Sequence, residues 1–436
     1  MTTNNPQDAT QLVRIEKPVY GGAFLARVEG KAVFVPLALA GEEARVRIAE
    51  EKRGYATAEV EEILSASPER IEPRCPHFGA CGGCSYQHTG YAQQIEIKRA
   101  ILRETLERGG VSAPEEIDVL AGEPWGYRNR IRLAIDATGR MGYRGRGSHA
   151  VVPLTECPIA APLLVEAARV AAEVLQTQAR MLRPTEIALF TNAEASELQV
   201  SVYARTAARG AFEVFARGLA ERAPALKGAE LVVEQAAQGR RGTPQQKTMA
   251  RWGASSIVYR AAGHEYRVDH GAFFQVNRWL VDGLVERVTH AAQGKLAWDL
   301  FAGVGLFARV LADRFERVIA VEAAPLATDA LAANLAGTGG KAVKASTVEY
   351  LRRVGTKEKP DFVVVDPPRA GLGAEVTAAL GALKAERMVY VSCDPATLAR
   401  DLKALTASGY AVERVAMADL FPQTFHLETV VELRRA

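Results

Sequence analysis

The sequence predicts an α/β protein with a doubly covered parallel sheet at its carboxyl-terminal end, a small antiparallel barrel at its amino-terminal end and an α+β region between them. From about residue 265, apolar runs of four to six residues alternate with helical stretches; these runs are KLAWDL, RVIAVE, DFVVVD and MVYVS. Continuous apolar strands between helices indicate a parallel sheet with both faces buried. Residues 12–64 instead alternate short β-rich runs with glycines, as small barrels do. Residues 125–262 mix strand-like runs with one alanine-rich helix near 160–180.

These patterns divide the chain into three expected domains. Residues 1–67 form the barrel, and Ser-Ala-Ser-Pro-Glu at 65–69 marks a linker. The central domain spans 68–264, and the carboxyl-terminal domain spans 265–436. Residues 91–110 are expected to form a helix that ends at a glycine pair and that is also a candidate to pack on the carboxyl-terminal domain.

Composition excludes several classes of protein. The 436 residues are 48% apolar and 24% charged, which is ordinary for a globular protein. No apolar run approaches the roughly 18 residues of a membrane span. The polar start MTTNNPQDATQ lacks the apolar segment of a signal peptide, so we expect a cytoplasmic protein. A net charge of +3 neither excludes nor demands nucleic acid, and residues 1–65 hold eight Lys and Arg against ten Asp and Glu.

A glycine-rich turn follows the first apolar strand of the carboxyl-terminal region. Asp299 ends that strand, Gly303 and Gly305 follow it, and Glu322 closes the next strand 23 residues after Asp299. Glycines there let a ligand approach the backbone, and a carboxylate at the second strand end can accept hydrogen bonds from ribose hydroxyls. The third glycine of the dinucleotide fingerprint is absent, because position 308 is Ala. The pattern therefore leaves a dinucleotide and S-adenosylmethionine both open.

A later strand end adds a second ligand signal. The run DFVVVD ends at Asp366 and is followed by two prolines and Arg369. Prolines stiffen a loop at the sheet edge where open α/β folds bind ligands. Together with the glycine turn, this loop favours a nucleic-acid methyltransferase over a proline turn with a capping carboxylate.

Cys393 lies where the strand MVYVS gives way to a helix, and Asp394-Pro395 suits the start of that helix. The helix amino terminus would favour the thiolate over the thiol. Addition of such a thiolate to C6 of uracil makes C5 nucleophilic, and the adduct must then lose its C5 proton to a base. Glu428, in FHLET, is the nearest candidate base in the remaining chain. A buried structural cysteine and an exposed strand glutamate are the alternatives.

Three cysteines cluster before the central domain's helix. Cys75, Cys81 and Cys84 have the spacing C-x5-C-x2-C, and Cys157 follows much later. Four thiolates can hold tetrahedral Zn²⁺ or a [4Fe–4S] cluster, and His77 and His88 lie close in sequence. Spacing alone does not choose between them. The fifth cysteine is Cys393.

A basic segment suggests a surface for RNA. Six arginines fall within 19 residues against one acid, Asp136, and the first three are spaced to share one face of a strand; they are Arg128, Arg130, Arg132, Arg140, Arg144 and Arg146. Such a row can neutralise phosphates, and Trp125, Tyr127 and Tyr143 could stack on unpaired bases. A solvated sheet face is the alternative. A second basic stretch, from Arg240 to Arg251, is expected to be a mobile loop.

Seven of these stretches occur in the order seen in the RNA uracil-5 methyltransferases, and the chain most resembles the RumA-type 23S rRNA enzymes. The matching segments are FVP-LALAGE, CPHFGACGGCSYQH, GAFFQVN, DLFAGVG, DFVVVDPPR, SCDPATLARDL and HLETV. The resemblance implies a TRAM barrel, an iron–sulfur domain and a Rossmann-like domain that binds S-adenosylmethionine. It also implies that Cys393 is the nucleophile and Glu428 the base. Four cofactor contacts follow from it as well: Gln275, Phe301, Glu322 and Asp366. It favours a [4Fe–4S] cluster on Cys75, Cys81, Cys84 and Cys157.

Two positions depart from that family's pattern. An Asn that the family commonly carries after the first strand would fall at 305–306, where this chain has Gly305 and Leu306, so one cofactor contact is missing. The family often has Asn at position 394, where this chain has Asp394. We expect that carboxylate to disfavour the thiolate of Cys393.

The sequence thus predicts an enzyme, expected to be monomeric, that methylates C5 of a uridine in RNA. The substrate is expected to be 23S rRNA, with tRNA as the alternative. Two other classes stay open. An amino-group methyltransferase would not need Cys393. An RNA-binding module with a degenerate catalytic domain would not bind the cofactor.

Overall fold

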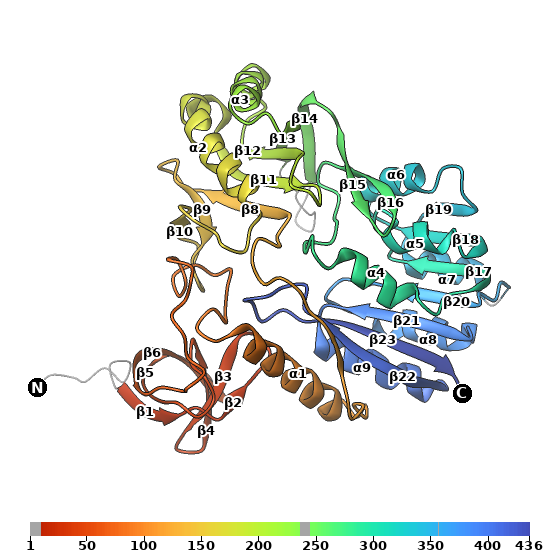
Figure 1. Ribbon diagram of the computed structural model, residues 1–436, viewed down its shortest axis with the longest axis horizontal. Coiled ribbons are helices and arrows are strands. Elements are labelled where there is room, and N and C mark those ends of the chain that lie inside the picture. The colour runs from red at the N-terminus through yellow and green to blue at the C-terminus, as the bar shows by residue number, and fades with distance from the viewer. Residues whose placement is uncertain (1–9, 236–244, 356) are drawn as a thin grey trace, which may run out of the picture.

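The computed structural model describes residues 10–235, 245–355 and 357–436. Figure 1 shows three β-sheet regions: an amino-terminal module in red, a central sheet in yellow and green, and a carboxyl-terminal domain in cyan and blue.

The amino-terminal module is a curved six-stranded sheet. Its strands are β1 (Thr10–Arg14), β2 (Lys17–Pro18), β3 (Ala23–Val28), β4 (Lys31–Pro36), β5 (Glu43–Glu51) and β6 (Tyr55–Ser65), in the spatial order β1-β5-β6-β4-β3-β2. The ladder of paired strands does not close on itself, because β1 and β2 are its two edges. Between β1 and β2 in the chain, the backbone N–H of Glu16 donates to the carbonyl of Leu25. The expected barrel is therefore a half-barrel.

The central sheet has seven strands in the order β10-β9-β8-β11-β12-β13-β14. They are β8 (Arg130–Ile135), β9 (Met141–Arg144), β10 (Val151–Pro153), β11 (Pro184–Thr191), β12 (Leu198–Ala204), β13 (Leu226–Gln235) and β14 (Gln245–Gly253). Helices α2 (Pro162–Leu182) and α3 (Arg209–Arg222) cover one face and share a buried cluster with it. The sequence predicted α2 and missed α3. Residues 245–251, expected to be part of a mobile loop, instead pair with β13 in β14, whereas Arg240 and Arg241 lie outside the described residues.

The carboxyl-terminal sheet has eight strands in the order β19-β18-β17-β20-β21-β23-β22-β7. They are β7 (Asp118–Leu120), β17 (Gly294–Leu300), β18 (Phe315–Glu322), β19 (Gly340–Lys344), β20 (Phe362–Val365), β21 (Arg387–Ser392), β22 (Tyr410–Ala418) and β23 (Glu428–Arg435). Strands β17 to β21 are parallel, and β23 inserts antiparallel between β21 and β22. From β17 the next strands, β18 and β19, are added on one side, whereas β20 and β21 are added on the other, so the strand order reverses between β17 and β20. Ligands bind outside the carboxyl ends of strands at such a point.

Alternating residues of this sheet pack into two separate hydrophobic cores, one on each face. Leu296, Trp298 and Leu300 of β17 belong to one buried cluster, which also contains residues of α7 (Thr347–Val354), α8 (Gly373–Leu383) and α9 (Pro395–Ala407). Ala297 belongs to the other, with residues of α4 (Val281–Thr289), α5 (Leu306–Leu311) and α6 (Pro325–Asn334). Helices therefore cover both faces, as the continuous apolar strands predicted.

Part of the chain before the central sheet joins the carboxyl-terminal domain. Helix α1 (Tyr91–Arg108) shares a buried cluster with α9, and β7 adds an edge strand parallel to β22. Lys98 of α1 forms a fully buried ion pair with Asp419 at 2.6 Å. The side chain of Gln94 bonds both the backbone N–H and the side-chain oxygen of Gln423 at 2.9 Å. These contacts fix the 419–427 loop that precedes Glu428.

A hairpin of β15 (Ser256–Ala261) and β16 (His264–Asp269) lies between the central and carboxyl-terminal sheets. The boundary expected at residue 264 falls inside this hairpin. Among the described residues, none of the helices is long and apolar enough to cross a membrane.

Candidate active site

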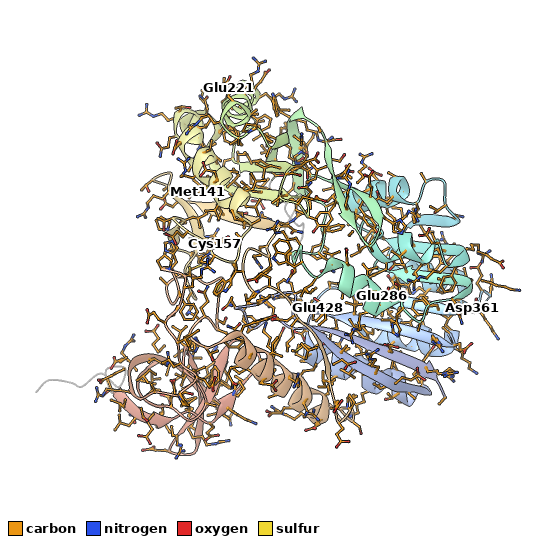
Figure 2. All side chains as sticks on the ribbon, in the orientation of Figure 1. Met141, Cys157, Glu221, Glu286, Asp361 and Glu428 are labelled. Atoms are coloured by element: carbon orange, nitrogen blue, oxygen red, sulfur yellow. The ribbon has the colours of Figure 1, made fainter. Side chains whose placement is uncertain are left out.

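Cys393 and Glu428 meet at the carboxyl edge of β21. Ser392 pairs with Thr429 in the antiparallel ladder of β21 and β23, which places the next residue on each strand end side by side. Asp366 ends the neighbouring strand β20, and Arg369 lies three residues further along. Figure 2 labels Glu428 at the inner end of β23, where the domain faces the rest of the molecule. The topology thus gathers a thiol, two carboxyl groups and a guanidinium from three strand ends.

Burial governs the protonation of the three acidic groups. It raises the pKa of Asp366 to about 7. The pKa of Glu428, whose side chain is 4% exposed, lies well above its usual range because of burial and the neighbouring Asp366. Burial, Glu428 and Asp366 together raise the pKa of the Cys393 thiol to about 11, and Arg369 partly opposes them. Three acids this close cannot all ionise.

The structure therefore corrects the expectation of a thiolate favoured by the helix amino terminus. Cys393 does precede α9, but desolvation and two carboxyl neighbours outweigh the helix dipole. Asp394 caps the helix by accepting the N–H groups of Ala396 and Thr397 at 3.1 and 2.9 Å. The acidic side chains that raise the pKa of Cys393 are thus Glu428 and Asp366, whereas the carboxylate of Asp394 caps the amino terminus of α9.

Arg369 is the cation of this site. Its guanidinium donates to Nδ1 of His426 at 3.0 Å. Because a guanidinium only donates, the imidazole ring of His426 accepts this hydrogen bond. Burial lowers the pKa of His426 to about 4, so the ring is neutral. The backbone carbonyl of Arg369 accepts from the hydroxyl of Thr397, which ties the loop to α9.

The glycine turn forms the second half of the site. Phe301, Gly303 and Gly305 all have positive φ, at 67°, 55° and 92°. For Phe301 this is a strained conformation of the kind found at ligand sites. A Cβ on Gly305 would lie 2.6 Å from Leu331, whereas one on Gly303 would meet nothing within 4 Å. Leu331 therefore fills the space next to Gly305, whereas no described residue fills the space next to Gly303, which could hold a ligand.

Carboxylates surround that turn. Glu322 accepts the N–H of Gly303 at 2.8 Å and those of Ala323 and Ala324 at 2.7 Å. Asp299 is fully buried, accepts the N–H of Ala308 at 2.9 Å, and has one oxygen with no partner among the described residues. Burial, with smaller contributions from Asp366 and Glu322, raises the pKa of Asp299 to about 8.

This cradle fits S-adenosylmethionine. A cationic ligand offsets the cost of ionising Asp299 and Asp366, and the unpartnered oxygen of Asp299 can still accept a hydrogen bond. Gln275 is buried in the loop before α4, and its neighbour Phe274 shares a core with Leu306 and Phe307 of α5. Leu306 itself is buried, and its carbonyl accepts from the hydroxyl of Tyr266 at 3.0 Å, so position 306 is structural here.

The four remaining cysteines are free thiols in one region of the central domain. The charge of Cys157 contributes to the raised pKa of Cys75, Cys81 and Cys84, for each of which burial is the larger cause. For Cys84 the pKa rises to about 12. Among the described residues, no three His, Cys, Asp or Glu are close enough to hold one metal ion.

Other groups around these thiols bear on what they could hold. His88 is buried against the carbonyl of Ala38, and His77 bonds the hydroxyl of Thr155, so both histidines have other partners. Arg128 lies beside Cys84, and its buried Nε has no hydrogen-bond partner within the described parts of the chain. An anionic four-iron cluster would supply the missing counter-charge, and it is wider than a zinc ion.

The predicted arginine row is only partly on the surface. Arg128 lies outside β8. Arg130 is half-buried against Phe190, donates to the carbonyl of Ala272 at 2.7 Å and has its pKa lowered to about 10 by desolvation. Arg132 is exposed but pairs with Glu186. Of the three aromatic residues, Tyr127 is fully buried, Tyr143 bonds Cys157 at 3.7 Å, and Trp125 reaches a pocket.

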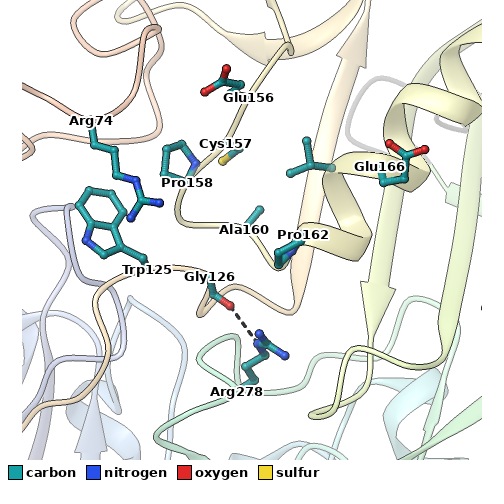
Figure 3. A pocket seen from close by; sticks show the side chains of 11 residues that line it. Arg74, Trp125, Gly126, Glu156, Cys157, Pro158, Ala160, Pro162, Glu166 and Arg278 are labelled. Carbon is teal, nitrogen blue, oxygen red and sulfur yellow. Dashed lines mark hydrogen bonds between the residues drawn. The ribbon is translucent and has the colours of Figure 1, made fainter.

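Figure 3 shows this pocket, which has a volume of about 560 Å³. The guanidinium of Arg74 lies 5.0 Å from the ring centre of Trp125, and Arg278 donates to the carbonyl of Gly126 at 2.9 Å. Cys157 and its neighbour Pro158 also line the pocket. Arg278 also lies 3.8 Å from the ring centre of Trp279, which is 45% exposed.

Sequence reasoning missed three residues of this site. Arg369 follows Asp366 and two prolines, and that position could have indicated it. His426 precedes Glu428 by two residues and offered the same kind of signal. Tyr20, whose hydroxyl donates to the carbonyl of Cys393 at 3.3 Å, is 373 residues away in the chain and gave no local signal.

Comparisons with known proteins agree with this geometry. Residues 256–436 match the family model described as tRNA (Uracil-5-)-methyltransferase, and residues 8–60 match the TRAM domain. The chain is 34% identical over 433 residues to a 23S rRNA (uracil(1939)-C(5))-methyltransferase RlmD of Klebsiella pneumoniae, covering 95% of this chain and 93% of that protein. It is also 34% identical to an uncharacterized RNA methyltransferase of Streptomyces avermitilis, covering 97% and 98%.

A solved structure matches over nearly the whole length. It is the tRNA (uracil-54, C5)-methyltransferase of Pyrococcus abyssi in complex with S-adenosyl-L-homocysteine, with a TM-score of 0.77, 25% identity and coverage of 97% and 99% of the two chains. The fold and site thus define an S-adenosylmethionine-dependent methyltransferase with an amino-terminal TRAM domain. The chain belongs to the RNA uracil-5 methyltransferase family.

Proposed function

We propose that this enzyme methylates C5 of a uridine in 23S rRNA through a covalent bond between Cys393 and C6 of the base. The observation that carries this proposal is the meeting of Cys393, Glu428 and Asp366 beside an acidic cofactor cradle. Relatives that are 34% identical over 95% of this chain act, by name, on 23S rRNA, which supports the choice of substrate.

The proposed reaction assigns one step to each side chain. The thiol of Cys393 releases its proton to solvent and its sulfur adds to C6, which leaves C5 electron-rich. S-adenosylmethionine supplies the methyl group that C5 takes. Glu428 then removes the C5 proton, the electrons of that bond restore the C5–C6 double bond, and the sulfur leaves. Burial raises the pKa of Glu428, which makes its carboxylate a stronger base than an exposed one.

Arg369 has an electrostatic role in this scheme. It is the charged neighbour that lowers the pKa of both Cys393 and Glu428. We propose that it stabilises the thiolate as the proton leaves, while neutral His426 holds the guanidinium in place. Gln275, Phe301, Glu322 and Asp366, together with the turn at Gly303 and Gly305, are the proposed cofactor contacts.

We propose that Cys75, Cys81, Cys84 and Cys157 hold a [4Fe–4S] cluster that supports the RNA-binding region. Uracil methylation transfers no net electrons, so a structural role fits better than a redox role. Arg128 and Arg146 both lie against these thiols and would balance the charge of the cluster.

Metal analysis tests that assignment. Protein purified without oxygen should absorb at about 400 nm and contain iron and sulfide. Cys81→Ala should lose both, and Cys393→Ser should keep both. Stoichiometric zinc in place of iron would contradict the assignment.

RNA is expected to contact the pocket of Figure 3. Trp125 and Trp279 offer aromatic faces, and Arg74 and Arg278 offer positive charge beside them. Stacking on aromatic groups next to cations is how proteins hold unpaired bases. The reaction itself needs an unpaired uracil, because C6 is inaccessible within a helix.

The substrate is tested with unmodified transcripts of 23S rRNA and tRNA and a labelled methyl donor. We expect label in 23S rRNA, at a single base that is released as 5-methyluridine. The tRNA alternative rests on the Pyrococcus abyssi structure, and label confined to tRNA would support it. Label on an exocyclic amino group would overturn the proposed chemistry.

We also propose domain limits that follow the sheets. The catalytic domain consists of two segments of the chain. One contains α1 and β7, and the other runs from the β15–β16 hairpin at residue 256 to residue 436, so the central domain is inserted between them. We propose that the enzyme acts as a monomer, because one chain supplies every group that the scheme uses.

A further inference from the structure

The turn between β2 and β3 brings the amino-terminal module into the catalytic centre. The hydroxyl of Tyr20 donates to the backbone carbonyl of Cys393 at 3.3 Å. The ring of Tyr20 packs edge-on against Phe425, with centroids 5.7 Å apart. Phe425 in turn packs against His426, the partner of Arg369, at 4.2 Å between ring centroids.

The neighbouring glycine shows how close this approach is. Gly22 is buried, and a Cβ on it would lie 2.9 Å from the hydroxyl of Ser85 and 3.1 Å from Phe425. Gly21, on the same turn, would meet nothing within 4 Å. The turn therefore fits between the segment that follows Cys84 and the loop that leads to Glu428.

The carbonyl of Cys393 needs a partner from outside its helix. The first intrahelical bond of α9 is accepted by Asp394, from the N–H of Leu398 at 3.1 Å. The carbonyl one residue earlier is thus outside the helical ladder, and rotation of that peptide would turn the thiol away from its present direction. Burial and the nearby acidic groups raise the pKa of Tyr20 well above its usual range, so its hydroxyl remains a donor at every working pH.

We infer that Tyr20 is a positioning residue for the methyl transfer: through the carbonyl of Cys393 it holds the nucleophile toward the base, and the TRAM domain thereby takes part in the chemistry. This inference rests on the proposed role of Cys393. It predicts that the amino-terminal module affects turnover and not merely RNA affinity.

The test uses the full-length enzyme with RNA that carries 5-fluorouridine at the target position, with enzyme in excess. Tyr20→Phe should slow formation of the covalent adduct with this RNA. With unmodified RNA it should lower kcat by about fivefold, the value of one ordinary hydrogen bond. The KM for RNA and the melting temperature should stay at wild-type values. Tyr55→Phe is the matched control, because Tyr55 is a tyrosine of the same module that is 37% exposed.

A glycine pair provides a second, independent variant set. Gly21→Ala and Gly22→Ala both place a side chain at positive φ, 107° and 88°, but Gly22→Ala alone creates a contact with Phe425. Gly22→Ala should therefore reduce kcat several-fold more than Gly21→Ala does.

The possible results separate the inference from the proposed function. Wild-type adduct formation with an unchanged rate in Tyr20→Phe would overturn the inference alone. A loss expressed only in the KM for RNA would also overturn it. Failure of the wild-type enzyme to form any adduct would instead overturn the proposed role of Cys393.

Discussion

At the scale of single residues, protonation controls the nucleophile. The thiol of Cys393 has a pKa of about 11, so its reactive thiolate fraction rises with pH throughout the neutral range. Alkylation of Cys393 by iodoacetamide should therefore accelerate about tenfold per pH unit from 7 to 9. Site-resolved mass spectrometry measures this rate, and a rate that is constant over that range would contradict the raised pKa.

Glu428→Gln separates the two roles that the scheme gives to this position. Removing the neighbouring charge lowers the pKa of Cys393, so alkylation at pH 8 should become faster than in the wild-type enzyme. Loss of the base should at the same time stop proton release from C5. With unmodified RNA this variant should accumulate the methylated adduct, visible by mass. Normal turnover by Glu428→Gln would contradict its assignment as the base.

The cofactor cradle should bind more tightly as pH rises. The pKa of Asp366 is about 7 and that of Asp299 about 8, so both carry protons over much of the neutral range. A cationic ligand favours their ionised forms, and a raised pH removes the protons in advance. Calorimetry should show the Kd of S-adenosylmethionine falling between pH 6 and pH 8, and Asp366→Asn should flatten that trend. A Kd that rises with pH would contradict it.

Residue types were predicted more reliably than their environments. Spacing and strand position predicted that Cys393, Asp366 and the glycine turn lie at strand ends, and the structure places Cys393, Glu428 and Asp366 at one edge of the sheet, where open α/β folds bind ligands. The burial that raises the pKa of Cys393 depends on segments distant in sequence. The exposure of the arginine row could not be predicted for a related reason: alternation along a strand does not reveal which face is covered, and Arg130 lies against Phe190.

At the scale of elements, Asp394 connects α9 to the nucleophile. Its side chain caps two N–H groups, and Asn makes the same cap. Asp394→Asn should keep both stability and activity. Asp394→Ala should lower the free energy of unfolding by about 1 kcal/mol. Denaturant titration and turnover measure the two effects, and a large activity loss in Asp394→Asn would refute this role.

The buried pair between Lys98 and Asp419 fixes α1 to the loop before Glu428. Lys98→Met leaves a buried carboxylate without its partner and should cost about 3–5 kcal/mol. The double variant Lys98→Met with Asp419→Leu should be clearly more stable than Lys98→Met alone. Equal stability of the single and double variants would show that the two charges are not coupled.

Periodicity predicted most elements of the catalytic domain because its strands are continuous apolar runs, as β17, β18, β20 and β21 confirm. It could not show that β7 joins the same sheet, since three residues carry no pattern and their pairing with β22 is long-range. The half-barrel was predicted as a barrel because alternation does not encode closure.

At the scale of the whole molecule, the RNA surface is expected to depend on the pocket more than on the arginine row. Trp125→Ala should weaken RNA binding by about 1–3 kcal/mol through lost stacking. Arg74→Ala should also reduce its salt dependence. Arg132→Ala should have a smaller effect, because Arg132 already pairs with Glu186. Filter binding at several salt concentrations measures these effects, with S-adenosylmethionine affinity as the control.

The sulfur–carbon bond is the central claim, and trapping it is the most direct test. RNA with 5-fluorouridine at the target position carries no removable proton at C5, so the reaction should stop with the RNA attached to the protein. The account predicts one methylated adduct per chain, with the peptide of Cys393 carrying the cross-link, and none in Cys393→Ser. A methylated product without any adduct, or a cross-link at another residue, would contradict it.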